Sequence, residues 1–478
     1  MVRGRVCQWA LLLSLVWWVA LWGIPGQSRA QDYDPNMLSY GIYWFGLNDA
    51  KQKFVPGEPN PYFDPTKPTL IFVHGWQPGL SANYPPNFTY RYFEGIWPKS
   101  VNTANAWIEA GWNVGIFFWN QFSDEAVVTD AEAKIWVNDG PKGMRWRKAD
   151  GSYEEAPPGT PSAGELFYQA YVDALGNSGC RTAEIRIVGH SLGGQMAVRL
   201  TKLIEDGISA GEVPSCLRPT RVVLLDPYWS LGSKDYLGEK TTADIVRGYV
   251  AELLARGILF EWYRSSSLTV EPKGLRNEEM ERMMLYAEMS PDFAGDQMSK
   301  HCAAYHLYFW SFAFPGPSAC MGNDCVQGPG KLLAKMDNAR LAALMRSDYF
   351  WRQSDGRATH SPADDLYEPV LRADAPYTIT QLVALPGGAV GETILVTATV
   401  RNVSQQPAEG VLVSFGASRG EISPRVVCHD GLAITAFSSS LPGTVYLWAT
   451  TEGEGGEIQA ELTLTLQSRL YLPFVSKP

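Results

Sequence analysis

The stretch that decides the fold is Glu184-Ile-Arg-Ile-Val-Gly-His-Ser-Leu-Gly-Gly194. It opens with a mostly apolar run, typical of a strand that is buried on both faces of a sheet. Apolar residues with helical spacing begin directly after the glycines, at Met196, and continue to Ile204. Ser191 therefore lies in a tight, glycine-rich turn between a strand and a helix.

Similar apolar runs alternate with helical stretches on both sides of this turn, between Pro68 and Asp226. Buried strands that are separated by helices indicate a parallel sheet with crossover connections. We therefore predict an α/β fold with a mostly parallel central sheet, to which residues 37–47 add an early strand pair. The runs are Thr69–Val73, Trp112–Phe118, Glu184–Val188 and Arg221–Leu225.

The pattern Gly-x-Ser-x-Gly places a serine nucleophile at the strand-to-helix turn of α/β-hydrolases, and it occurs three times in this chain of 45 glycines. Only the match at Gly189–Gly193 has a strand-like run before it and a helix after it. The match at Gly207–Gly211 follows a helix, and the match at Gly416–Gly420 lies between two β-rich runs. We predict that Ser191 is the nucleophile and that the other two serines match by chance.

A serine nucleophile needs a histidine that takes its proton and a carboxylate that orients the histidine. In α/β-hydrolases the acid and then the histidine follow the serine along the chain. Asp226 ends an apolar run, so it should lie at the carboxyl edge of the sheet, where ligands bind; Asp292 is the alternative acid. The histidines that follow the serine are His301, His306, His360 and His429, of which the last two are expected to be surface residues.

Five short segments, taken together and in this order, resemble the pancreatic-type lipase family over about residues 37–330. They cover a His-Gly-aromatic turn, the serine signature, a strand-end acid, a histidine at the start of a helix and a short cysteine loop. The segments are Phe72–Trp76, Val188–Gly194, Leu225–Pro227, Ala303–Tyr308 and Cys320–Cys325.

The resemblance implies hydrolysis of neutral lipid or other apolar esters through an acyl-enzyme. We expect no cofactor or metal, because the sequence has no glycine-rich phosphate loop, no dinucleotide fingerprint and no CxxC or His/Cys cluster. Phospholipase and acyltransferase activities are alternatives on the same fold. His301 is the alternative base, while His74 and His190 are expected to bond the backbone beside tight turns. The implied residues are Ser191 as nucleophile, Asp226 as acid, His306 as base, and the backbone N–H groups of Trp76 and Leu192 as oxyanion donors.

Residues 227–300 are a candidate lid or acyl-binding cap, although they lack the disulfide that closes the lid of the animal lipases. Apolar residues of this segment could line an acyl site, and a plain core helix and strand is the alternative. The residues in question are Leu253, Leu254, Ile258, Leu259, Phe260 and Trp262.

The sequence changes its character after residue 376. Short β-rich runs with Gly and Pro turns predict an all-β sandwich over 377–467, and this region resembles the bacterial Ig-like domains of the invasin type. We therefore expect a hydrolase domain at 31–360, a linker at 361–376, and a short aromatic tail at 468–478. A cell-surface binding protein on a decayed hydrolase fold is the non-catalytic alternative.

The amino terminus and the charge balance define the compartment and the partners. Residues 1–30 read as a secretory signal peptide, with an uncleaved membrane anchor as the alternative, and predict a secreted or cell-surface bacterial protein. The net charge of −10 gives no reason to bind nucleic acid. In an exported protein the six remaining cysteines suggest disulfides. The proposed pairs are Cys180 with Cys216 and Cys320 with Cys325.

Overall fold

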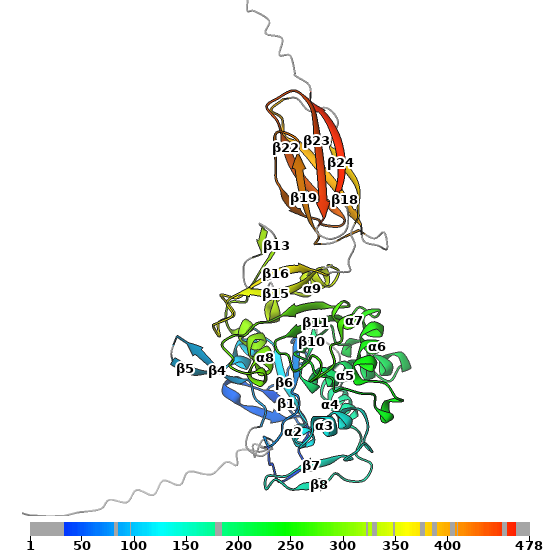
Figure 1. Cartoon of the computed structure of the whole chain (residues 1–478). Coiled ribbons are helices and arrows are strands. Elements are labelled where there is room, and N and C mark those ends of the chain that lie inside the picture. The colour runs from blue at the N-terminus through cyan, green and yellow to red at the C-terminus, as the bar shows by residue number, and fades with distance from the viewer. Residues whose placement is uncertain are drawn as a thin grey trace, which may run out of the picture.

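The computed structural model describes two parts, a large α/β part and a β-sandwich that is set apart from it (Figure 1). The predicted signal peptide and carboxy-terminal tail lie outside the described residues. These are residues 33–464 except 81–84, 96, 177–183, 322–323, 327–331, 348, 373–377, 385–389, 402–406, 409 and 452–456.

The large part is built around a mixed sheet whose described strands number twelve. They are β1 (Gly41–Phe45), β2 (Lys51–Lys53), β3 (Thr69–Val73), β6 (Asn113–Phe118), β9 (Ile185–His190), β10 (Arg221–Leu225), β11 (Leu259–Arg264), β12 (Leu285–Glu288), β13 (Ser318–Met321), β14 (Asp324–Val326), β15 (Tyr349–Asp355) and β16 (Leu366–Leu371). Their spatial order is β14-β13-β16-β15-β12-β11-β10-β9-β3-β6-β1-β2.

The centre of this sheet is parallel, as the alternation of apolar runs and helices predicted. Strands β12, β11, β10, β9, β3 and β6 pair in parallel, and β1 pairs antiparallel with β6 and β2. Every residue of β3, β6, β9 and β10 is buried, which explains why these strands read as apolar runs rather than as alternating patterns.

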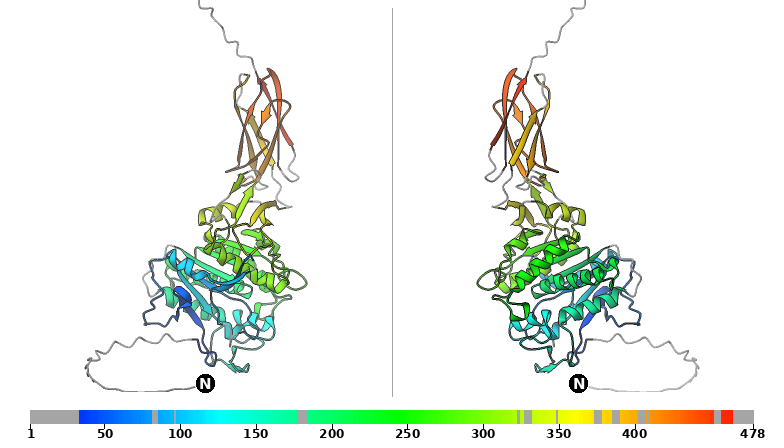
Figure 2. Two further views of the ribbon diagram at one scale, coloured as in Figure 1. Left: turned by 90° about the vertical axis from the view of Figure 1, so that its left-hand side faces the viewer. Right: turned by 90° about the vertical axis from the view of Figure 1, so that its right-hand side faces the viewer.

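Helices cover both faces of the sheet (Figure 2). One face carries α3 (Val128–Trp136), α4 (Ala163–Gly176), α5 (Leu192–Ala210) and α6 (Thr242–Leu254); the other carries α1 (Thr103–Glu109), α8 (Gln297–Ala313) and α9 (Asn338–Met345). Successive strand residues point to opposite faces, so Ile71 packs in the first core and Phe72 in the second. Two separate cores therefore hold the carboxyl ends of the strands in place.

The predicted linker is wrong in part, because β16 lies inside residues 361–376. This strand pairs antiparallel with β15 and is thus part of the large sheet. Its pairing with β13 covers Leu366 and Tyr367 only, so Pro369 has a strand partner on one side alone, Trp351 of β15. The Pro within this segment hid the strand from sequence reasoning.

The remaining elements are short hairpins and single turns. Two hairpins are formed by β4 (Thr89–Glu94) with β5 (Trp97–Asn102) and by β7 (Arg145–Arg147) with β8 (Tyr153–Glu155). The short helices are η1 (Leu47–Asp49), α2 (Asn120–Ser123), η2 (Ser215–Leu217), η3 (Asp235–Leu237), α7 (Glu278–Glu281) and η4 (Leu333–Lys335).

The carboxy-terminal part is an all-β sandwich, as predicted. Its strands are β17 (Thr378–Ala384), β18 (Ile394–Arg401), β19 (Leu412–Ala417), β20 (Glu421–Ile422), β21 (Arg425–Val427), β22 (Leu432–Ser438), β23 (Gly443–Thr451) and β24 (Glu457–Leu464). They form two antiparallel sheets, ordered β17-β18-β22-β20 and β21-β19-β23-β24. Inward-facing residues such as Val396, Val413 and Phe437 fill the space between the sheets.

Two of the cysteine predictions can be compared with the structure. Cys216 is in a disulfide. The proposed pairing with Cys180 requires that the strands following the two cysteines, β9 and β10, are parallel neighbours, and they are. Cys180 itself lies outside the described residues. Cys320 stands opposite Cys325 in the β13–β14 register.

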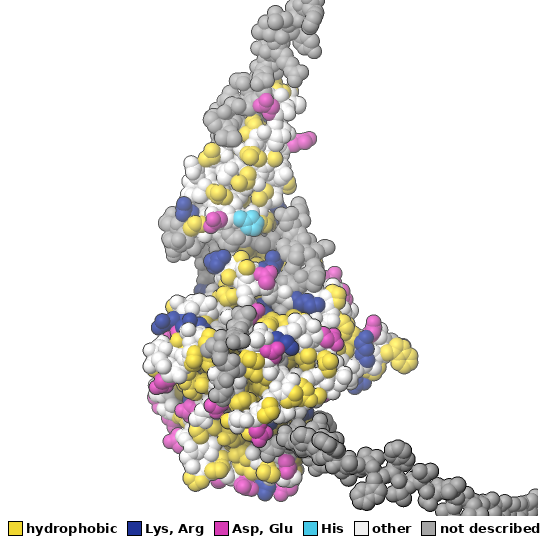
Figure 3. Space-filling view, turned by 180° about the vertical axis from the view of Figure 1, so that it is seen from behind, with side chains coloured by type: hydrophobic (Ala, Val, Ile, Leu, Met, Phe, Trp, Pro, Cys, Tyr) yellow, Lys and Arg dark blue, Asp and Glu magenta, His cyan; other side chains and the backbone are white. Residues whose placement is uncertain are grey.

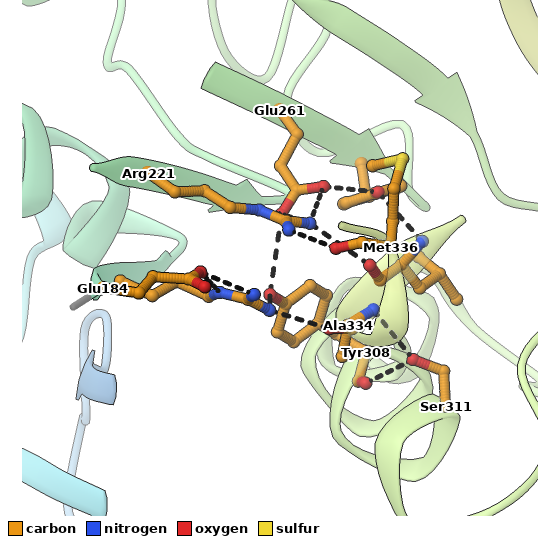
Figure 4. Close-up of polar contacts among 10 residues, drawn as sticks. Glu184, Arg221, Glu261, Tyr308, Ser311, Ala334 and Met336 are labelled. Atoms are coloured by element: carbon orange, nitrogen blue, oxygen red, sulfur yellow. Dashed lines mark hydrogen bonds and ion pairs between the residues drawn. The ribbon is translucent and has the colours of Figure 1, made fainter. Parts of the chain in front are cut away.

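The surface of the large part mixes charges of both signs with apolar side chains (Figure 3). In the described residues no helix is both long and apolar enough to cross a bilayer. Charge is also buried, at the amino ends of β9, β10 and β11 (Figure 4). There Arg221 and Glu261, both fully buried, form two hydrogen bonds of 2.8 Å, from Nε to Oε1 and from Nη2 to Oε2.

This buried ion pair also holds the segment around η4. Arg221 donates to the carbonyl of Met336 at 2.6 Å, and the neighbouring Arg186 donates to the carbonyl of Ala334 at 2.7 Å and to the Tyr308 hydroxyl at 3.1 Å. The guanidinium groups thus use their remaining donors on backbone oxygens, which is how a buried charge is tolerated.

We expect Glu261→Gln to lower the free energy of unfolding by about 3–5 kcal/mol, because it leaves the Arg221 charge buried without a counterion. The exposed pair of Glu94 and Lys99 supplies the control, and Glu94→Gln should change stability by less than about 1 kcal/mol. Urea unfolding of both variants measures the difference, and equal losses would contradict this account of the buried pair.

Candidate active site

Ser191 occupies a strained turn at the carboxyl end of β9. Its backbone angles are φ 57° and ψ −125°, a region that residues with a side chain rarely adopt. The turn is held by hydrogen bonds from Ser191 N to Leu225 O, at 3.1 Å, and from Tyr228 N to Ser191 O, at 3.2 Å. The structure thus places this serine on the strand-to-helix turn that the sequence predicted.

Glycine is required around this turn because the backbones approach closely. A Cβ on Gly193 would lie 2.2 Å from the Val73 carbonyl oxygen, and a Cβ on Gly75 would lie 2.5 Å from the Ser191 Cβ. The other two Gly-x-Ser-x-Gly matches do not lie at a strand-to-helix turn. Gly207 lies inside α5, and Gly416 lies within β19.

Asp226 lies directly after β10, fully buried and with a positive φ of 41°. Its carboxylate accepts hydrogen bonds from Ser265 N at 2.9 Å, from Ser266 N at 3.3 Å and from the Ser266 hydroxyl. The fourth donor is His301, whose Nδ1 lies 2.6 Å from Asp226 Oδ2. The predicted strand-end acid is therefore paired with a histidine. Asp292, the alternative acid, instead forms ion pairs with Lys300 and Arg357.

The histidine that pairs with Asp226 is His301, and the prediction that His306 stands there is wrong. Both residues belong to α8, but five positions rotate a side chain by about 140° around a helix, so they cannot share one partner. His306 packs on Tyr90, with ring centroids 4.7 Å apart. Burial, with a smaller effect of His360, lowers the pKa of His306 to about 3, so its ring is neutral at pH 7.

Two other histidines bond the backbone beside the turns, as expected. His74 Nδ1 lies 2.9 Å from the carbonyl oxygen of Gly75, and His190 Nε2 lies 3.0 Å from the carbonyl oxygen of His301. Burial lowers the pKa of His74 to about 4 and that of His190 well below its ordinary value. Each neutral ring therefore donates to a carbonyl and fixes a segment of the site.

The two predicted oxyanion donors belong to residues next to the Ser191 turn. Leu192 is the first residue of α5, where the helix leaves backbone N–H groups unpaired. Trp76 follows Gly75, whose backbone contacts Ser191. Among the described hydrogen bonds, the backbone N–H of Trp76 has no partner. Both groups are thus available to an anionic oxygen.

The turn that carries Trp76 is anchored by residues 119–125, a segment of which the sequence indicated only Trp119 as a possible neighbour of the site. Trp119 Nε1 donates to the His74 carbonyl at 2.8 Å, and Trp76 Nε1 donates to the Glu125 carbonyl at 2.7 Å. The Glu125 side chain is fully buried and pairs with Lys134 at 2.6 Å. Glu125 and Lys134 lie far from Trp76 in the sequence, so their charges gave no signal that they support the turn that carries it.

Ser191 and His301 line one cavity of about 660 Å³. In the described residues the serine hydroxyl makes no hydrogen bond to His301, a geometry that is common before substrate binds. No carboxylate lines the cavity among the described residues. Apolar and aromatic side chains form most of the lining, and they include Phe72, Trp76, Pro78, Leu80, Pro86, Tyr90, Val128, Tyr228, Leu268, Met298 and Tyr305.

Of the two interpretations of the six apolar residues in segment 227–300, the structure supports the plain core helix and strand and not the acyl site. All six belong to α6, β11 or the loop between them, and they pack in the cores on either side of the sheet. The segment contributes Tyr228, Leu268, Lys273 and Met298 to the cavity instead. In the part of the chain that is described, His, Cys, Asp and Glu residues form no group that could hold a metal.

No model of a known protein family matches the sequence, and no curated protein matches it. Solved structures share a likeness over about a fifth of the chain. A carboxy-terminal intimin fragment in complex with an intimin-binding domain is 22% identical over 18% of this chain and 33% of its own, with a TM-score of 0.17. The Yersinia pseudotuberculosis adhesin InvE is 23% identical over 19% and 28%, with a TM-score of 0.17.

Invasin, described as a bacterial integrin-binding protein, is 14% identical over 22% of each chain, also with a TM-score of 0.17. The chain spans a third or less of the length of these three proteins. These likenesses are too limited in extent to bear on what the cavity does.

Proposed function

We propose that this protein is a serine carboxylic-ester hydrolase, of the lipase or esterase type, on an α/β-hydrolase fold. The observation that carries the proposal is the strained Ser191 turn beside the Asp226–His301 pair, at the carboxyl edge of a parallel sheet. A serine, a histidine and a buried acid in this arrangement are what acyl transfer through a covalent intermediate requires.

In the proposed reaction His301 Nε2 takes the proton of the Ser191 hydroxyl as the serine oxygen attacks the ester carbonyl. Asp226 accepts from Nδ1, which fixes the imidazole tautomer and stabilises the imidazolium that forms. The backbone N–H groups of Trp76 and Leu192 stabilise the oxyanion. His301 then protonates the departing alcohol. A water molecule, deprotonated by His301, attacks the acyl carbon; the bond from this carbon to the Ser191 oxygen breaks, and His301 returns the proton to that oxygen as the acid leaves.

The cavity supports an apolar, uncharged ester as the substrate. Its lining is mainly apolar and aromatic, and the described lining residues include two basic side chains, Arg91 and Lys273, and no carboxylate. The buried histidines around it are neutral, because burial lowers the pKa of His74, His190 and His306. Neutral lipid esters fit this lining best, and phospholipid and acyltransfer reactions are variants of the same chemistry.

A panel of esters tests the proposal. It consists of p-nitrophenyl esters with acyl chains of increasing length, a triglyceride emulsion and phospholipid vesicles. We expect turnover of at least the p-nitrophenyl esters. No turnover of any ester would favour the second reading, in which the fold is a binding module without catalysis.

The second reading, cell-surface binding without catalysis, is favoured by one observation, the separate β-sandwich (Figure 1). We propose that the sandwich contacts a cell or substrate surface and that the protein is secreted or held at a bacterial cell surface. The disulfide at Cys216 supports an oxidising compartment. Binding of the intact protein to bacterial cells or lipid emulsions, with and without Ser191→Ala, separates attachment from catalysis.

A further inference from the structure

One wall of the cavity is a cluster of aromatic rings that the proposed mechanism does not use. Tyr305 and His306, adjacent on α8, have ring centroids 4.3 Å apart. Tyr90, on β4, lies 5.2 Å from the Tyr305 ring and 4.7 Å from the His306 ring. Phe72, at the end of β3, lies 6.0 Å from Tyr305. We call these four residues the aromatic wall.

The aromatic wall belongs to the same cavity as the nucleophile. All four of its residues line the cavity together with Ser191 and His301. Tyr305 and His306 keep part of their surface exposed, whereas Tyr90 and Phe72 are buried. The two exposed rings are therefore the ones most open to a ligand, and both pack on the buried ring of Tyr90.

The cavity lining also contains aliphatic side chains, from Leu80, Val128, Leu268 and Met298. Aliphatic side chains accept any apolar group, whereas rings favour another ring in an edge-to-face or offset contact. The rings of the lining, unlike its aliphatic side chains, can thus distinguish a planar ring from an aliphatic group of similar size.

We infer that the aromatic wall, with His306 and Tyr305 as its contact residues, selects an ester that carries a planar aromatic ring about two carbons from its ester group. The inference rests on the proposed hydrolase function and names the substrate class for that same site. His306 has the role of a specificity residue here, because its ring is neutral and stands apart from Asp226.

Matched esters test this inference. In the acyl arm, methyl 3-phenylpropanoate is compared with methyl 3-cyclohexylpropanoate; in the alcohol arm, 2-phenylethyl acetate is compared with 2-cyclohexylethyl acetate. The two esters of each pair have the same number of carbons, and the ring is two carbons from the ester, so their intrinsic reactivities are similar. The rate of hydroxide-catalysed hydrolysis of each ester corrects kcat/KM for the difference that remains. We expect kcat/KM to favour the phenyl ester by about five- to tenfold in one arm.

Variants of the wall show whether the rings cause the preference. His306→Leu and Tyr305→Leu should reduce the preference to about twofold or less, because each removes one ring contact. His306→Phe is the matched control and should retain the preference, since it keeps a ring without the imidazole nitrogens. Thermal unfolding of each variant shows whether it folds. If Tyr305→Leu does not fold, the comparison of His306→Leu with His306→Phe tests the inference alone, because His306 is partly exposed and its substitution disturbs the core less.

Each outcome decides the inference. A phenyl preference that is lost in His306→Leu and kept in His306→Phe supports it. Equal rates on phenyl and cyclohexyl esters in both arms, or a preference that the leucine variants keep, would overturn it while leaving the hydrolase intact. Failure to hydrolyse all four esters and the p-nitrophenyl panel would instead overturn the proposed function, and the inference with it.

Discussion

Replacing Ser191 by alanine is expected to lower kcat for p-nitrophenyl ester hydrolysis by about 10⁴- to 10⁶-fold. In the proposed reaction the serine oxygen forms the acyl-enzyme, and alanine offers no group that could replace it in that step. Substrate binding uses the cavity lining, which the substitution leaves in place, so KM should change little. Release of p-nitrophenolate at saturating ester measures the effect.

A serine from a chance match of the same motif supplies the control. Ser209 lies in the second Gly-x-Ser-x-Gly match, exposed near the end of α5, and Ser209→Ala should leave kcat unchanged. Both variants should unfold at the temperature of the wild type or above it, because the substitution at position 191 removes no contact within the cores. Full activity of Ser191→Ala would exclude this serine as the nucleophile.

His301→Ala is expected to lower kcat by about 10⁴-fold or more, because it removes the group that takes the serine proton and leaves the Asp226 carboxylate without its imidazole. His306→Phe should lower kcat by less than about tenfold, because it keeps a ring in the aromatic wall and touches no reacting atom. Steady-state kinetics of the two variants on one p-nitrophenyl ester make the comparison.

The pair of variants separates the two assignments of the base. Loss of activity in His306→Phe together with retained activity in His301→Ala would restore the assignment that the family resemblance implied. Loss in both would show that the wall contributes to more than substrate choice. The structure predicts a large loss in His301→Ala alone.

The parts of the site that the sequence predicted are those with local signals. The turn at Ser191 is preceded by a strand and followed by a helix within about ten residues, so context alone selected it among three matches. Asp226 could be found in the same way, because it ends a buried strand. The central sheet was also predictable, since its parallel strands are continuous apolar runs.

The parts that the sequence did not predict depend on contacts between distant segments. His301 and His306 share one helix, and only the packing of α8 against β10 and β11 decides which of them faces Asp226. The strand β16 contains a proline, and its place in the sheet depends on its partner β15. The apolar residues of α6 and β11 looked like an acyl site because a core strand and a ligand wall have the same composition.

The most direct test of the central claim, that Ser191 is a nucleophile activated by His301, is to locate the residue that a fluorophosphonate probe modifies. The intact protein is treated with the probe and digested, and the labelled peptide is sequenced by mass spectrometry. We predict one phosphonylated residue, Ser191, in the wild type and in His306→Phe, and no label within the same time in His301→Ala. Absence of the label from the wild-type peptide that contains Ser191, or undiminished labelling of that peptide in His301→Ala, would contradict the account.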